Sequence, residues 1–133
     1  MENISIVSDI SSIPNAIKFA EDFLEKNGLD FAKKTAIVFD EILSNIAKYA
    51  YKGEKKNIEV VCDYDEKNKT LTFKFEDFGT EFNPLGVKEA DTTASADDRP
   101  IGGLGIFIVK NFMDDVVYER KNDKNILTLK KNL

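Results

Sequence analysis

Three polar side chains, Glu41, Asn45 and Lys48, recur at helical spacing in the stretch 36–50. On a helix of about 100° per residue they fall within roughly 60° of one another, so a carboxylate, an amide and an ammonium group share one side. Ile37 and Val38 flank them, which indicates a partly dry groove. Amide and carboxylate oxygens suit Mg²⁺, which is usually held by one or two protein groups together with phosphates and waters. The alternative is a solvated glutamate and lysine around a mid-helix asparagine.

A second candidate group is Asp77, which ends an alternating apolar strand and is followed two residues later by Gly79. An ionised carboxylate at a pocket rim accepts a hydrogen bond from an exocyclic amine such as that of adenine. A glycine beside it lets the backbone approach a flat ring. The alternative is an ordinary turn, since Asp-x-Gly after a strand is common.

A third candidate is a glycine-rich run, Gly102-Gly103-Leu104-Gly105-Ile106, which leads into an apolar helix. Glycines at a helix amino terminus expose backbone N–H groups, and these donors and the helix dipole favour a phosphate. The run is neither a P-loop nor a G-x-G-x-x-G motif after a strand. Arg99, just before it, is placed to reach a terminal phosphate. The alternatives are a flexible hinge for the glycines and a solvated charge for the arginine.

Apolar periodicity predicts the elements that position these groups. In chain order it predicts a short strand at 4–6, a helix from 12 to 28, a longer helix from Asp30 to about Tyr51, and a hairpin with strands at 58–64 and 71–75. Asp30 is expected to cap the second helix, and Gly28 and Gly53 to end the two helices.

The second half of the chain begins with a long polar stretch at 85–100, which lacks apolar periodicity and predicts a lid or a disordered loop. A helix with Leu104, Ile108 and Phe112 on one face follows, and a hairpin at 116–119 and 126–129 closes the chain. This order predicts an α+β fold, a two-layer sandwich whose antiparallel or mixed sheet carries helices on one face. The 133 residues are expected to form a single domain.

Composition narrows the range of partners. A net charge of -5 with interspersed signs argues against a nucleic acid or an anionic membrane as the main partner. The chain has no histidine, so it lacks the usual zinc ligand sets and cannot carry phosphate on an imidazole. Its single cysteine, Cys62, cannot form a disulfide within the chain. A signal peptide and a long apolar run are both missing, so a cytoplasmic location is expected.

The order of these motifs carries a family resemblance. E-x-x-x-N on a helix, D-x-G after a strand, a long polar loop and G-G-x-G at a helix start resemble the GHKL superfamily of ATP-binding domains, which have the histidine-kinase-like (Bergerat) fold. Within it, the chain is most similar to the anti-sigma-factor serine kinases of bacteria, the RsbW type. The resemblance covers essentially the whole chain and is carried by DEILSNIAKYAY at 40–51, EDFGTEFNP at 76–84, RPIGGLGI at 99–106 and NFMD at 111–114.

The resemblance implies a role for each polar residue of the second helix. Asn45 is expected to ligate Mg²⁺, and Glu41 to act as the general base or to orient a water. Lys48 is expected to lie near the phosphates.

The resemblance also implies how the nucleotide is held. Asp77 would bind the adenine amine, while Gly79 and Phe82 would shape the base pocket. Residues 85–101 would form the ATP lid. The phosphate contacts are expected from Arg99, Gly102, Gly103, Leu104, Gly105 and Ile106.

The implied activity is that of an ATP-dependent protein serine/threonine kinase with ATP and Mg²⁺ as cofactors. Its expected substrate is an anti-sigma-factor antagonist of the STAS type, its second expected partner is a sigma factor, and it is expected to form a homodimer. Two alternatives stay open. One is a nucleotide-gated binding module without kinase activity, and the other is a scaffold with a vestigial pocket.

Overall fold

The structure of this chain is a computed structural model that describes residues 1–84 and 103–133. The predicted lid at 85–101, with Arg99 in it, and the neighbouring Gly102 lie outside the described residues. For Gly103 and Leu104 only the helical backbone is described.

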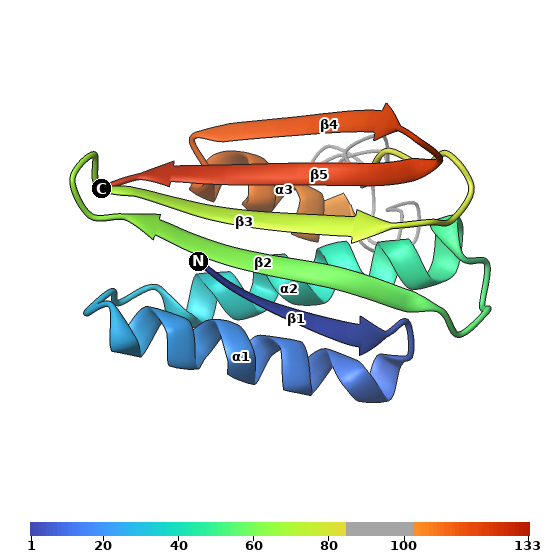
Figure 1. The fold of residues 1–133 in the computed structure, drawn as a ribbon, viewed down its shortest axis with the longest axis horizontal. Coiled ribbons are helices and arrows are strands. Elements are labelled where there is room, and N and C mark those ends of the chain that lie inside the picture. Colours follow the sequence, from blue (N-terminus) through green and yellow to red (C-terminus); the bar gives the residue numbers. More distant parts are fainter. Residues whose placement is uncertain (85–102) are drawn as a thin grey trace, which may run out of the picture.

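A five-stranded sheet forms one layer of the molecule (Figure 1). Its strand order is β1-β2-β3-β5-β4, and each neighbouring pair is antiparallel. The strands are β1 at Glu2–Val7, β2 at Asn57–Asp65, β3 at Thr70–Asp77, β4 at Asp115–Lys121 and β5 at Lys124–Asn132. Both predicted hairpins, β2-β3 and β4-β5, are therefore confirmed. β5 lies between β3 and β4, so the chain crosses over from β3 to β4 by way of a helix.

In the described part of the chain, three α-helices form the second layer, on one face of the sheet (Figure 1). They are α1 at Ile13–Lys26, α2 at Ala32–Asn45 and α3 at Gly103–Phe112. A 3₁₀ turn, η1 at Ile10–Ser12, precedes α1, and a π-helical turn, η2 at Ile46–Ala50, continues α2. The arrangement confirms the predicted α+β sandwich with helices on one face. Within the described residues, none of these helices has the length and apolarity needed to cross a membrane.

The core lies between the two layers and is built on aromatic contacts. Phe39 of α2 meets Phe73 and Phe75 of β3 at centroid distances of 5.1 and 5.0 Å, with interplanar angles of 88° and 72°. Edge-to-face pairs of this kind each add about 1 kcal/mol to the burial of the rings. Every second residue of β3 faces this core, and the alternation ends with Asp77, which is therefore carried into the buried layer.

The second helix differs from the prediction at both ends. It begins at Ala32 after Phe31, which makes no side-chain capping bond, so the expected Asp30 cap is wrong. Regular α-helix ends at Asn45, because the next five residues switch to the wider π-helical turn and Tyr51 N–H donates to the Ile46 carbonyl at 3.0 Å. Gly28 and Gly53 have φ of 69° and 86°, so the predicted glycines do follow the helical segments, Gly28 after α1 and Gly53 after η2.

Candidate functional site

The last turn of α2 brings Glu41 and Asn45 together, as their spacing predicted. Asn45 Nδ2 donates to Glu41 Oε1 at 3.2 Å, and Asn45 is only 4% exposed. This bond uses one N–H of the amide. Among the described residues no hydrogen bond reaches Asn45 Oδ1, so this oxygen is the atom that Asn45 can offer to a cation.

Glu41 is a carboxyl group in a partly buried setting. Burial raises the pKa of Glu41, while the hydrogen bond from Asn45 acts in the opposite direction. The neighbouring Asp40 carboxylate also raises this pKa, and the Lys48 ammonium lowers it. A carboxylate with a raised pKa holds a proton more readily than an exposed one, which suits a general base.

Gly105 packs directly against the Glu41 side chain. A Cβ placed on Gly105 would overlap the Glu41 carboxylate and would lie 2.6 Å from Glu41 Cγ. Because Gly105 has no side chain, the start of α3 can pack directly on the Glu41 carboxylate. Sequence reasoning assigned Gly105 to the phosphates, and the structure gives it a contact with Glu41 that the sequence did not predict.

Lys48 and Ile106 lie in settings that the sequence pattern did not predict. Lys48 lies in η2, where the turn is no longer α-helical, and its side chain is exposed. The 100° geometry that aligned it with Asn45 therefore does not apply to it. Ile106 is fully buried in the core, so only its backbone could face a nucleotide.

Asp77 lies inside the protein rather than at an open rim. It is 2% exposed, and Oδ1 accepts hydrogen bonds from Gly79 N–H at 2.9 Å and from Asn125 Nδ2 at 2.8 Å. Burial raises the pKa of Asp77, whereas these two bonds and the nearby Arg120 charge act to lower it. In the described part of the chain both hydrogen bonds go to Oδ1, which leaves Oδ2 for a ligand donor.

Gly79 has a packing role that differs from the one expected from the sequence. A Cβ on Gly79 would lie 2.5 Å from the Ala50 carbonyl oxygen and 2.8 Å from the Ala50 Cβ, both at the end of η2. The next residue fixes this contact, because Thr80 N–H donates to the same Ala50 carbonyl at 2.9 Å. Glycine is therefore needed for the turn after β3 to dock on η2, whether or not a flat ring binds there.

Asn125 is the polar residue that sequence reasoning missed. It is 2% exposed on β5, and its Nδ2 donates to Asp77 Oδ1 and to the Thr80 carbonyl, both at 2.8 Å. Its Oδ1 accepts three bonds, from Phe82 N–H at 3.1 Å, Tyr118 OH at 2.6 Å and Arg120 Nη1 at 3.2 Å. One signal was present in the sequence, since Asn125 continues the inward alternation of Leu127 and Leu129.

Two tyrosines at the end of the second helical segment, Tyr49 in η2 and Tyr51 directly after it, hold the segment that follows Asp77. Phe82 stacks on Tyr49 at 5.2 Å between centroids and 35° between planes. Tyr51 OH donates to the Asn57 carbonyl at 2.5 Å and accepts from Phe78 N–H at 2.9 Å. Because η2 directly follows Asn45, these contacts join the Asp77 segment to the end of α2. The predicted base-binding and metal-binding residues are thus parts of one continuous structure.

The sequence of this chain is similar to a known family of ATP-binding domains. The family described as the histidine kinase-like ATPase domain matches residues 6–131. The chain belongs to this family. The match includes all three motifs, from Glu41 and Asn45 through Asp77 to the glycine turn.

Individual proteins similar to this ATPase-domain chain are named as protein kinases. A serine-protein kinase RsbW of Listeria monocytogenes is 33% identical over 84 residues, which is 60% of this chain and 53% of that protein. An RsbW of Staphylococcus aureus is 26% identical over 102 residues, covering 73% of this chain and 64% of that protein. The serine/threonine-protein kinase BtrW of Bordetella bronchiseptica is 28% identical over 91 residues, covering 68% and 63%. The chain spans about half the length of the first of these relatives.

Proposed function

We propose that this domain binds ATP with Mg²⁺ and transfers the γ-phosphate to a serine or threonine of an anti-sigma-factor antagonist. The observation that carries the proposal is the buried Asn45 side chain, hydrogen-bonded to Glu41 and offering one oxygen, in a chain of the ATPase-domain family. The similarity to serine-protein kinases supports the reaction class. A sigma factor as second partner, a homodimer, the lid at 85–101 and a cytoplasmic location belong to the same proposal.

The residues present fit a magnesium ion that arrives with its nucleotide. Within the described residues no group of three or more His, Cys, Asp or Glu side chains could hold a metal, so this part of the chain offers no complete metal cage. Mg²⁺ is commonly held by one or two protein oxygens plus phosphates and waters, and Asn45 Oδ1 supplies one such oxygen. When bound, the ion would neutralise charge on the phosphates.

Asp77 would select the base. Its unoccupied Oδ2 can accept a hydrogen bond from an exocyclic amine, while Asn125 and Gly79 N–H hold Oδ1 in place. A site built around such an acceptor discriminates against bases without a matching donor, because its buried polar group would stay unpaired. This feature supports adenine as the base.

Glu41 would act as the general base for transfer. It would take the proton of the acceptor hydroxyl as that oxygen bonds to the γ-phosphorus and the bond to the ADP oxygen breaks. Burial and the Asn45 bond position this carboxylate before any substrate arrives. Positioning and charge account for most of the rate in phosphoryl transfer, so a preset acid and amide pair suits the reaction.

A nucleotide-gated binding module without chemistry is the second candidate. The contact between Gly105 and Glu41, together with the Asn45 bond, gives Glu41 a structural explanation that requires no catalysis. The two candidates differ in what loss of the carboxylate does. Catalysis needs the ionised acid, whereas packing and hydrogen bonding tolerate glutamine.

Transfer of radiolabelled phosphate from ATP to a STAS-type antagonist of the same genome tests the proposal. Wild type should transfer, and Glu41→Gln should lower transfer by about 100-fold or more while ATP binding stays within about twofold. Glu25→Gln, an exposed glutamate on α1, is the matched control and should transfer normally. Undiminished transfer by Glu41→Gln removes the base role, and nucleotide binding by a wild type that never transfers favours the binding module.

A further inference from the structure

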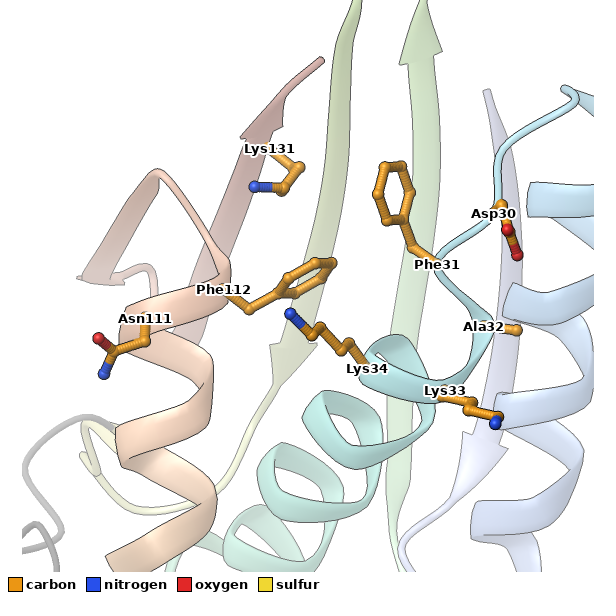
Figure 2. A pocket seen from close by; sticks show the side chains of 8 residues that line it. All are labelled: Asp30, Phe31, Ala32, Lys33, Lys34, Asn111, Phe112 and Lys131. Carbon is orange, nitrogen blue, oxygen red and sulfur yellow. The ribbon is translucent and has the colours of Figure 1, made fainter.

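A cavity lies at the opposite end of α2 from the Glu41 and Asn45 pair. It has a volume of about 690 Å³, and the residues that line it come from the start of α2, the end of α3 and the end of β5. We call it the basic cavity; its main lining side chains are Phe31, Lys33, Lys34, Asn111, Phe112 and Lys131 (Figure 2). Lys34 and Asn45 are separated by roughly 16 Å along the helix axis, so the cavity is distinct from the proposed nucleotide site.

The charge around this cavity is positive, whereas the net charge of the chain is negative. The whole protein carries -5, yet among the described residues the lining of the cavity contains three lysines and one acid, Asp30. Within the described residues neither Lys33 nor Lys34 has an ion-pair partner, and Lys131 makes only a long pair with Asp114 at 3.7 Å. The charges of these three lysines are therefore largely uncompensated by the part of the chain that the structure describes.

Two of these ammonium groups are held over the same aromatic ring. Lys34 Nζ lies 5.3 Å and Lys131 Nζ 5.0 Å from the Phe112 ring centroid. Phe112 in turn packs against Phe31 at 5.8 Å between centroids, and Figure 2 shows both rings between the start of α2 and the end of β5. Like charges brought to one ring repel each other, and an anion lying between them would relieve that repulsion.

The start of α2 adds to the positive field. Phe31 makes no side-chain capping bond, and the first turn contains lysines where acidic residues are usually found. The positive end of the helix dipole and the positive lysine side chains thus lie together here. This arrangement is electrostatically unfavourable unless an anionic partner binds.

We propose that the basic cavity binds an acidic peptide segment of a partner protein. Carboxylates of the segment would lie between Lys34 and Lys131, and an apolar side chain would pack on the Phe31 and Phe112 rings. A peptide fits better than a small anion for two reasons. The partly exposed Phe31 ring offers apolar surface beside the lysine charges, and the lining amide of Asn111 already uses one N–H to donate to the Phe107 carbonyl of its own helix at 2.7 Å.

The test is to titrate a peptide into the full isotope-labelled chain and to measure the NMR chemical shifts of its backbone amides. The probe is a short synthetic peptide of Asp, Glu, Leu and Phe, and its control has Asn and Gln in place of the acids. The acidic peptide should shift the amides of 31–34, 111–112 and 131, and the neutral peptide should not. Lys34→Gln with Lys131→Gln should weaken binding by about tenfold, since both charges contact the segment.

The matched control variant is Lys74→Gln with Lys130→Gln, which removes the same charge from the outer face of the sheet. Lys130 neighbours Lys131 but points to the other side of β5, because side chains alternate along a strand. This control should bind within about twofold of wild type. Equal loss in both double variants, equal binding of the neutral peptide, or the same amide shifts with inorganic phosphate alone would overturn the proposal.

Discussion

At the scale of single residues, Asn125 organises the candidate site through hydrogen bonds within the protein. Its amide joins Asp77, the backbone of the following segment and the side chains of β4 in one buried network. Sequence reasoning found Asp77 from its place at the end of an apolar strand. It missed Asn125, because the partners that define Asn125 lie up to 48 residues away in the chain.

Asn125→Ala should lower the free energy of unfolding by about 3 kcal/mol, because it leaves several buried polar groups without their hydrogen-bond partner at once. Urea unfolding followed by circular dichroism measures the change. Asn111→Ala is the matched control, since among the described residues that exposed asparagine bonds to its own helix alone, and it should change stability by less than about 1 kcal/mol. Equal effects of the two substitutions would contradict the role of Asn125.

Asp77→Asn should change the pH dependence of stability. Burial raises the folded-state pKa of Asp77 above its unfolded value, so the folded state binds this proton more tightly. The contribution of Asp77 is therefore most favourable below the unfolded pKa of about 3.9 and is lost as pH rises through the folded value. Relative to wild type, the variant should gain stability as pH rises from that acid range to neutrality. A constant difference between the two proteins in urea unfolding across this range would contradict the assignment.

At the scale of elements, the strands and hairpins were predicted better than the ends of the helices. Strands β2, β3 and β5 alternate strongly, and polar turns separate the hairpin partners, so both hairpins were predicted correctly. The end of α2 was not, because a switch to π-helical hydrogen bonding depends on how η2 docks under Gly79 and Thr80. Such π-helical turns often occur at functional sites, and this one directly follows Asn45.

Gly105→Ala tests the contact between α3 and α2. In a helix this substitution usually stabilises by about 0.5–1 kcal/mol, but here the new methyl group would overlap Glu41. We expect a loss of about 1–3 kcal/mol instead, measured by thermal or urea unfolding, since either α3 or Glu41 must move. Phosphoryl transfer should fall with it. A variant more stable than wild type would show that α3 does not close over Glu41.

At the scale of the whole molecule, the sequence predicted the two layers but not the order of the strands. The long-range pairing of β3 with β5 places Asn125 opposite Asp77, and local patterns carry no information on that pairing. The basic cavity likewise escaped the sequence, because it assembles the start of α2 with the ends of α3 and β5.

Cys62 offers a probe of global stability. It is fully buried in the middle of β2, and burial raises the pKa of its thiol to about 12. The thiolate is the reactive form, so the native chain should resist thiol reagents and react only as fast as it unfolds. Labelling with a chromogenic disulfide at neutral pH, with and without urea, measures this. Rapid labelling of the native protein would contradict the burial of β2.

The most direct test of the central claim is calorimetric titration of the full chain with ATP and Mg²⁺. We predict binding by wild type at one site per chain, with affinity at least about tenfold weaker in Asn45→Ala and in Asp77→Asn, because each loses a group on which the ligand depends. Asn111→Ala should bind as wild type does. No binding by the folded wild-type chain, or unchanged affinity in both site variants, would contradict a nucleotide site at Asn45 and Asp77.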